Sequence, residues 1–267
     1  MQENSSLRNL QGNLRLRVLE MYNAANAGHI ACSLSCIDLL IAAFLNNKLP
    51  DEYFILSKGH AAAALYACLN YTGEMSDEEL KTFYKNGTAL TAHPAPNQFK
   101  SIPLATGSLG HGLPFGAGIA KAAKLKKKDS CTFVLMSDGE TNEGTTWEAA
   151  HFARHHQLDN LIVMIDKNGL QGFGETKEVL GDTSTPAQWS SLGFDVFETD
   201  GHDVNQNIRL IAKLRGENNG MPKAIITQTV KGKGISFMEG KLEWHYLPIP
   251  DIQLVQAREE ITRNYLS

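Results

Sequence analysis

The sequence is poor in several features that would indicate a particular class of protein. It has only four cysteines in 267 residues, and no two of them form a Cys-x-x-Cys pair. We therefore expect buried thiols in a reducing cytoplasm, not a disulfide framework or a four-ligand zinc site. No stretch approaches the about 20 apolar residues of a membrane-spanning helix, and the first residues carry no secretory signal pattern. A cytoplasmic protein without a membrane segment is predicted.

Positive charge and proline are also scarce. The formal net charge is -4, which argues against a nucleic-acid-binding surface. The basic run at residues 121–128 lies at the end of a helical pattern and is interpreted as a solvated helix end. Three of the nine prolines, Pro94, Pro96 and Pro103, gather in one long loop. Loops of that length in a compact domain are usually functional or mobile.

Apolar runs alternate along the chain with helical patterns. Expected strands cover residues 53–57, 131–136, 161–166, 194–198 and 223–228, and expected helices cover residues 6–25, 33–45, 61–69, 143–158 and 203–214. This alternation indicates parallel βαβ units, and continuously apolar strands indicate a sheet covered on both faces. The predicted fold is therefore α/β, with three α/β/α layers around a mostly parallel sheet. Residues 1–267 are interpreted as one domain with a helical N-terminal segment.

Two oxygen-bearing side chains follow two of these strands. Asp138 lies two residues after the run ending at Met136, and Asn168 lies three residues after the run ending at Ile165. Ligands of doubly wound sheets bind at the carboxyl ends of the strands. Asp138, Asn168 and the backbone carbonyl of Leu170 could hold Mg²⁺, or Ca²⁺, and leave positions for phosphate oxygens. Gly139 adds a backbone N–H that no side chain obstructs.

The spacing of this pair resembles a known cofactor fingerprint. Asp138-Gly139, then residues 140–166, then Lys167-Asn168 is similar to the thiamine-diphosphate-binding motif, with Ser137 and Lys167 in place of the usual glycine and asparagine. Further segments resemble transketolases: Ala27-Gly28-His29, Leu56-Ser57-Lys58-Gly59-His60-Ala61, Ala92-His93-Pro94, Thr106-Gly107-Ser108-Leu109-Gly110-His111-Gly112, and the stretch from Lys231 to Glu239 followed by Trp244-His245. The matched segments occur in order from about residue 20 to about residue 245.

The resemblance implies a role for each matched residue. The implied catalytic residues are His29, His60, His93, His245 and Glu143, with Glu143 as a relay between paired active sites. The implied cofactor-binding residues are His60, Gly107, Leu109, Gly139, Glu140, Asn168 and His245, and the implied metal ligands are Asp138, Asn168 and Leu170. The implied cofactors are thiamine diphosphate and Mg²⁺ or Ca²⁺. Neutral histidines near pH 7 suit the proton transfers and hydroxyl contacts that sugar chemistry requires.

The resemblance also implies a partner. In transketolases, a second, pyrimidine-binding domain supplies the glutamate that activates the cofactor, and the sequence after His245 is too short to contain that domain. The hypothesis is a diphosphate-binding N-terminal subunit of a split transketolase, in an α2β2 assembly with a pyrimidine-binding C-terminal subunit. The pair would transfer a two-carbon ketol unit from a ketose, or ketose phosphate, to an aldose.

Three alternatives remain at this point. The first is a related thiamine diphosphate enzyme subunit, similar to 1-deoxyxylulose-5-phosphate synthase or to 2-oxo-acid decarboxylases. The second is a scaffold subunit without catalysis, which the retained histidines and Asp138 argue against. The third is a nicotinamide oxidoreductase, which is disfavoured because no Gly-x-Gly-x-x-Gly motif opens a helix after a strand.

Overall fold

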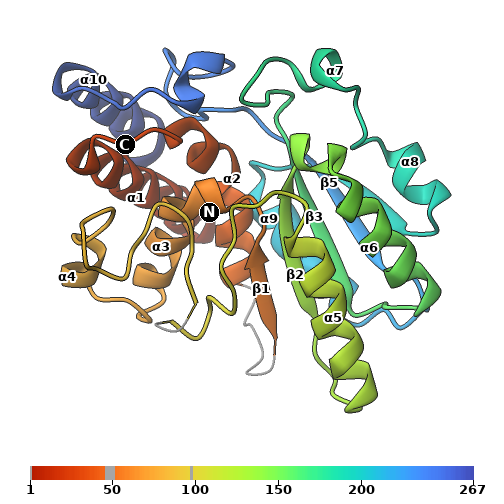
Figure 1. The fold of residues 1–267 in the computed structure, drawn as a ribbon. Helices are drawn as coiled ribbons and strands as arrows, with labels where there is room; N and C mark the ends of the chain where they lie inside the picture. The colour runs from red at the N-terminus through yellow and green to blue at the C-terminus, as the bar shows by residue number, and fades with distance from the viewer. Residues whose placement is uncertain (1, 46–51, 97–98) are drawn as a thin grey trace.

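A five-stranded sheet lies at the centre of the molecule in the computed structural model, which describes residues 2–45, 52–96 and 99–267 (Figure 1). All paired strands are parallel, in the order β1-β2-β3-β5-β4. The strands are β1 (Tyr53–Leu56), β2 (Thr132–Ser137), β3 (Leu161–Lys167), β4 (Asp195–Asp200) and β5 (Lys223–Gln228). The sheet is thus the parallel one that the sequence predicts, with the last strand inserted between the third and the fourth.

Helices cover both faces of the sheet. They are α1 (Gln2–Ala25), α2 (Ile30–Phe44), α3 (Ala62–Tyr71), α4 (Asp77–Leu80), α5 (Gly112–Leu125), α6 (Gly144–His155), α7 (Thr176–Val179), α8 (Pro186–Ser191), α9 (Val204–Arg215) and α10 (Asp251–Ile261). Shorter turns are η1 (Gly59–Ala61), η2 (Gly139–Asn142), η3 (Leu242–His245) and η4 (Thr262–Leu266). We find no helix in the described ranges with the length and apolar character needed to cross a membrane.

Alternate side chains of each strand enter two separate hydrophobic cores. Phe133 and Leu135 of β2 face the core that includes α2, α3 and α9, whereas Val134 and Met136 face the core that includes α5 and α6. Successive strand residues point to opposite faces, so a strand must be apolar throughout to fill both cores. All six residues of β2 are buried. The continuous apolar runs in the sequence have this physical origin.

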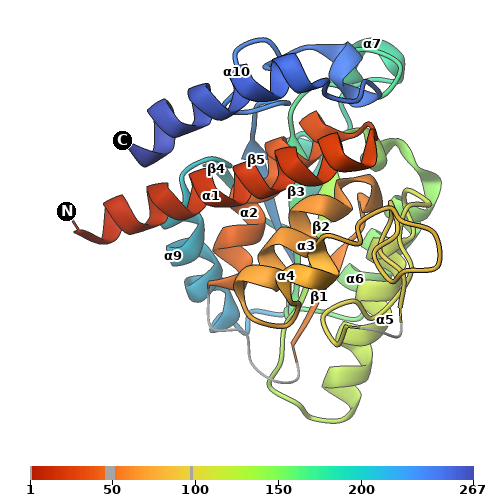
Figure 2. The same ribbon diagram turned by 90° about the vertical axis from the view of Figure 1, so that its left-hand side faces the viewer.

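The two ends of the chain pack together outside α2. Figure 2 shows α1 and α10 side by side, with both termini at the same side of the molecule. Arg258 of α10 forms an ion pair with Glu20 of α1 at 2.9 Å. The predicted N-terminal helical segment is therefore an outer layer over one face of the sheet.

A buried charged network connects this outer layer to the sheet. Arg15 of α1 donates to both carboxylate oxygens of Asp38 in α2, at 2.8 and 2.5 Å. Nδ1 of His202, before α9, lies 2.8 Å from the same carboxylate, and its Nε2 accepts from the N–H of Val230 at 2.9 Å. Neither Arg15 nor Asp38 is exposed to solvent. His202 is therefore a structural residue of this network.

The four cysteines agree with the sequence analysis, because all are buried and none forms a disulfide. The basic run also agrees: α5 ends at Leu125, and the side chains of residues 126–128 are exposed. Several boundaries differ from the expectation by a few residues; for example, α2 begins at Ile30, three residues before the predicted start. Ile30 and Ala31 are fully buried, and burial of this first turn extends the helix.

Candidate active site

The predicted oxygen ligands lie together at one edge of the sheet. β2 and β3 are neighbours in register, with Ser137 opposite Asp166, and α6 is the crossover helix between them. Asp138 and Asn168 therefore lie at the carboxyl ends of two adjacent strands. The Asn168 amide oxygen accepts from the N–H of Leu170 at 3.1 Å, which fixes its orientation in the turn.

Asp138 is a buried carboxylate that the backbone orients. Its Oδ1 accepts from the N–H of Gly139 at 2.8 Å, and its Oδ2 accepts from the N–H of Gly169 at 2.7 Å and from the Thr176 hydroxyl at 3.1 Å. Burial and the nearby Asp166 raise the pKa of Asp138 to about 6. Within the described residues, no Lys or Arg forms an ion pair with it. A cation at this position would stabilise the ionised form.

Lys231 contacts the Leu170 carbonyl, the third predicted metal ligand. Its Nζ donates to that carbonyl at 3.0 Å and lies 2.8 Å from Nδ1 of His245. Burial lowers the pKa of Lys231. The predicted metal ligands and the predicted histidines are therefore joined through this lysine.

Four histidines from four separate segments form one cluster beside these groups. The ring centroid of His29 lies 5.4 Å from that of His60, 5.3 Å from that of His245 and 6.2 Å from that of His93. The His29 backbone has a φ of 74° and donates its N–H to the His245 carbonyl at 3.0 Å. This left-handed conformation lets the loop before α2 approach η3 closely.

The histidines of this cluster are neutral at pH 7. Burial, then His93 and Lys231, lower the pKa of His29 to about 4. Burial, then Lys231, His29 and Lys58, lower the pKa of His245 to about 3. Burial also lowers the pKa of His60 and of His93. A neutral imidazole offers both a donor and an acceptor, which suits the recognition of hydroxyl groups.

A cavity of about 520 Å³ brings nearly all predicted site residues together. Its wall contains His29, His60, His93, Gly107, Leu109, Asp138, Gly139, Glu143, Asn168, Leu170 and His245. Cavities of this size commonly hold small molecules and cofactors. Glu143 lies at the exposed edge, at the N-terminus of α6.

Glu140 is the predicted site residue that the structure places behind this wall. Its buried Oε1 accepts from the Gly110 N–H at 2.8 Å and from the Ser57 hydroxyl, and its Oε2 accepts from the Ser137 N–H at 3.4 Å. Burial raises the pKa of Glu140 to about 7, against the lowering effect of these donors. Its side chain thus holds the glycine loop against the end of β2.

Several residues of the cavity wall were not singled out from the sequence, among them Cys32, Lys58 and Lys231. Lys58 and Lys231 lie inside segments that resemble transketolases, so the motifs themselves carried the signal. Lys58 forms a buried ion pair with Asp166 of β3. Cys32 was interpreted only as a buried thiol; the structure places it in the first turn of α2, three residues after His29.

Gly107 is a position of the glycine loop where an added side chain would be strained and would meet a site residue. Its φ is 133°, and an added Cβ would lie 2.6 Å from Cδ2 of His93. We expect Gly107→Ala to lower the free energy of unfolding by about 1–3 kcal/mol and to displace His93. The matched control is Gly73→Ala, which has a φ of 80° and open space around the new methyl group. Urea unfolding that gives equal losses for both variants would contradict the His93 contact.

The comparisons with known sequences agree with this geometry. Residues 8–265 match the family model described as transketolase, thiamine diphosphate binding domain. One subunit of the apulose-4-phosphate transketolase of Phocaeicola vulgatus is 40% identical over 241 residues, which cover 87% of this chain and 85% of that protein. The 6-deoxy-6-sulfo-D-fructose transketolase subunit SqwG of a Clostridium species is 32% identical over 259 residues, or 94% of each chain.

Solved structures of transketolases are also similar to this chain. The transketolase of Campylobacter jejuni superposes with a TM-score of 0.87 at 28% identity, over 96% of this chain and 42% of that one. The transketolase of Leishmania mexicana superposes with a TM-score of 0.85 at 25% identity, over 97% and 42%. This chain thus spans less than half the length of those enzymes. The chain belongs to the transketolase family, in which it corresponds to the thiamine diphosphate binding domain.

Proposed function

We propose that this chain is the diphosphate-binding subunit of a two-chain transketolase. Together with a pyrimidine-binding subunit in an α2β2 assembly, it transfers a two-carbon ketol unit from a ketose, or ketose phosphate, to an aldose. The observation that carries the proposal is the meeting of two features in one cavity. Asp138, Asn168 and Leu170 provide oxygen ligands, and four neutral histidines stand beside them.

The oxygen ligands fit a magnesium ion that also binds a diphosphate. Mg²⁺ prefers octahedral oxygen coordination and usually keeps substrate phosphate oxygens in its shell. The Asp138 carboxylate is buried and has backbone and hydroxyl donors but no cationic partner within the described ranges. A bound cation would supply the missing positive charge. Lys231, which contacts the Leu170 carbonyl, is placed to meet phosphate oxygens on the other side.

The histidines fit the sugar end of the reaction. Thiamine diphosphate, when bound, supplies the electron sink that stabilises a carbanion. His29, His60, His93 and His245 would orient the sugar hydroxyls and hold or move their protons. Their lowered pKa values keep one ring nitrogen of each free to accept a proton near pH 7. Ketol transfer requires several such contacts, which favours it over simple decarboxylation.

Apolar side chains at the cavity rim support the proposed partner. Phe173, Leu180 and Tyr246 line the cavity, and 85%, 68% and 55% of their respective surfaces are exposed. Exposed apolar groups that adjoin one site commonly mark a protein interface. Relatives named as transketolase subunits are similar in extent to this chain, which covers 85–94% of their length. The partner would supply the activating glutamate, and Glu143 at the edge would face it.

The proposal predicts that turnover requires both chains. The chain would be purified with Mg²⁺ and thiamine diphosphate, alone and together with a pyrimidine-binding subunit taken from a neighbouring reading frame. We expect ketol transfer, measured as aldose release from a ketose phosphate donor, only in the mixture. Full turnover by the chain alone contradicts the two-chain assignment. Release of CO₂ from pyruvate in place of ketol transfer favours the decarboxylating alternative.

A further inference from the structure

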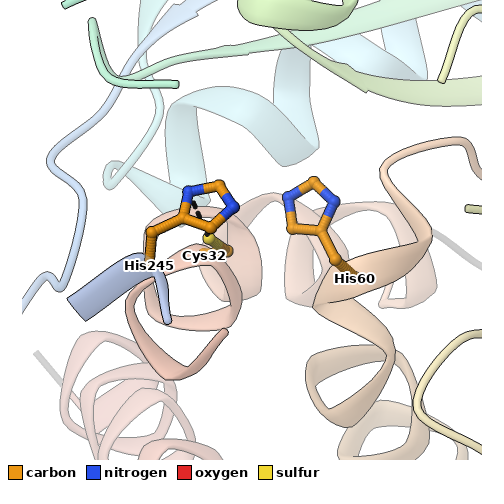
Figure 3. Close-up of side chains that lie close together, drawn as sticks. All are labelled: Cys32, His60 and His245. Carbon is orange, nitrogen blue, oxygen red and sulfur yellow. Dashed lines mark hydrogen bonds between the residues drawn. The ribbon is translucent and has the colours of Figure 1, made fainter. Parts of the chain in front are cut away.

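One thiol and two imidazole side chains meet in the wall of the cavity. Figure 3 shows Cys32 from α2, His60 from η1 and His245 from η3 around one point. One ligand atom of each lies within 4.8 Å of the others. The Cys32 sulfur is 3.6 Å from Nδ1 of His245, and the two rings stack with centroids 5.6 Å apart. Thiolate and imidazole ligands differ in kind from the oxygens around Asp138.

Hydrogen bonds fix the backbone that carries two of these side chains. The His60 carbonyl accepts from the Tyr22 hydroxyl at 3.2 Å, and the His245 carbonyl accepts from the His29 N–H at 3.0 Å. Cys32 is almost fully buried in the first turns of α2. Both imidazoles are neutral because burial lowers their pKa values, so each carries a ring nitrogen lone pair that can coordinate a metal. The backbone segments that carry the two histidines, and the buried position of Cys32, are therefore set by contacts that do not involve a cofactor.

We propose that Cys32, His60 and His245 form a binding site for a thiophilic divalent cation, of which Zn²⁺ is the best match. Zn²⁺ binds one thiolate and two imidazoles at about 2.3 Å for sulfur and about 2.0–2.1 Å for nitrogen. Small side-chain movements bring the three atoms from their present spacing to these distances. The Cys32 thiol loses its proton to solvent, the two imidazoles donate lone pairs, and a water molecule completes the tetrahedron.

Positive side chains near the site set its affinity. Lys58 is neutralised by its ion pair with Asp166. Lys231 competes with the metal for the His245 imidazole, because its Nζ lies 2.8 Å from Nδ1 of His245. It also contacts the Leu170 carbonyl, which gives it a second partner when a metal takes the imidazole. Removal of this competitor by Lys231→Met should strengthen zinc binding, while it should weaken diphosphate binding.

The site has a consequence that rests on the proposed function. His60 and His245 are proposed to contact the cofactor and the sugar, so one imidazole cannot serve the metal and these ligands together. Zn²⁺ at this position therefore excludes thiamine diphosphate and the sugar donor. Cys32 would make the cofactor-free subunit sensitive to free zinc, whereas Mg²⁺ at the oxygen ligands would leave the site unaffected.

Cobalt substitution on the purified chain tests the metal site without any cofactor. Tetrahedral Co²⁺ with a thiolate ligand gives a charge-transfer absorption band in the near ultraviolet, and Zn²⁺ displaces it. We expect this band in the wild-type chain, in Asp138→Ala and in Cys36→Ser. Cys36 is the matched control, because it is a buried thiol of the same helix that bonds the Cys32 carbonyl. Excess Mg²⁺ should not remove the band.

Cys32→Ser should lose the charge-transfer band and bind Zn²⁺ at least about 100-fold more weakly, since even the loss of a group that only supports a ligand costs about 10–100-fold. No band in the wild-type chain, or an equal band in Cys32→Ser, overturns the site.

Competition between Zn²⁺ and the cofactor is measured in a separate experiment, as the ratio of thiamine diphosphate affinities with and without Zn²⁺. A ratio that changes in the wild type but not in Cys32→Ser supports exclusion, and an unchanged ratio in both overturns it. If no thiamine diphosphate binds to the mixture of this chain and the pyrimidine-binding subunit even without Zn²⁺, the proposed function fails, but the metal site does not.

Discussion

Replacement of Asp138 by alanine is expected to weaken Mg²⁺-dependent binding of thiamine diphosphate by at least about 100-fold. The carboxylate is the single anionic group among the three proposed metal ligands. Its removal also leaves the Gly169 N–H and the Thr176 hydroxyl without their acceptor. Titration calorimetry with and without Mg²⁺ measures the effect directly, because the metal-dependent part of the binding should disappear.

One further variant separates the charge of this side chain from its shape, and a second variant serves as the control. Asp138→Asn keeps the size of the side chain but removes its charge, so it should also lose most of the magnesium dependence. Asp182→Ala is the matched control on a nearby loop, where the carboxylate pairs with Lys167 and bonds Ser184. It should bind the cofactor as the wild type does. Wild-type binding by Asp138→Asn would be incompatible with the metal assignment.

Replacement of Lys58 by methionine is expected to cost about 3–5 kcal/mol of folding free energy. Lys58 and Asp166 are both buried and form an ion pair at the end of β3. Attraction by Asp166 outweighs burial and raises the pKa of Lys58, and the pKa of Asp166 is lowered in turn. Without the lysine, Asp166 keeps hydroxyl donors from Ser35 and Thr229 but no countercharge. The unfolding temperature should fall by roughly 10 °C.

A double variant tests the cause of this loss. Asp166→Asn removes the unpaired charge, so Lys58→Met combined with Asp166→Asn should recover most of the stability. The matched control is Lys177→Met, because Lys177 pairs with Glu175 at an exposed position, and such pairs contribute only about 0–1 kcal/mol. Urea unfolding of the four proteins gives the comparison. A loss for Lys58→Met no larger than that for Lys177→Met would show that the buried pair is not the cause.

The strands and the oxygen ligands could be predicted from the sequence because their signals are local. An apolar run such as residues 161–166 shows a strand buried on both faces, and a polar residue directly after it must lie at the edge of the sheet. One helix between two such runs makes the strands parallel neighbours. The meeting of Asp138 with Asn168 follows from these rules without knowledge of any distant contact.

The contacts of Lys231, Cys32 and Glu140 could not be predicted in this way, because they depend on distant parts of the chain. Lys231 reaches His245 and Leu170 only because β5 lies between β3 and β4, and no local pattern determines that insertion. The apolar helix around Cys32 indicates burial, but it does not show that the sulfur faces a polar cavity. Glu140 follows the strand as Asp138 does, yet its side chain turns back toward Ser57.

The network of Arg15, Asp38 and His202 has a consequence for the order in which the molecule is completed during synthesis. The segment that carries Lys231 is held by His202 through the Val230 N–H, and by Arg15 through the Lys233 carbonyl at 3.3 Å. These contacts join positions about 30 to more than 200 residues apart. Chains leave the ribosome from the N-terminus onward. We therefore expect the sheet edge with Asp138 to form on a partly made chain, whereas the wall with Lys231 and His245 closes only when nearly all of it has emerged.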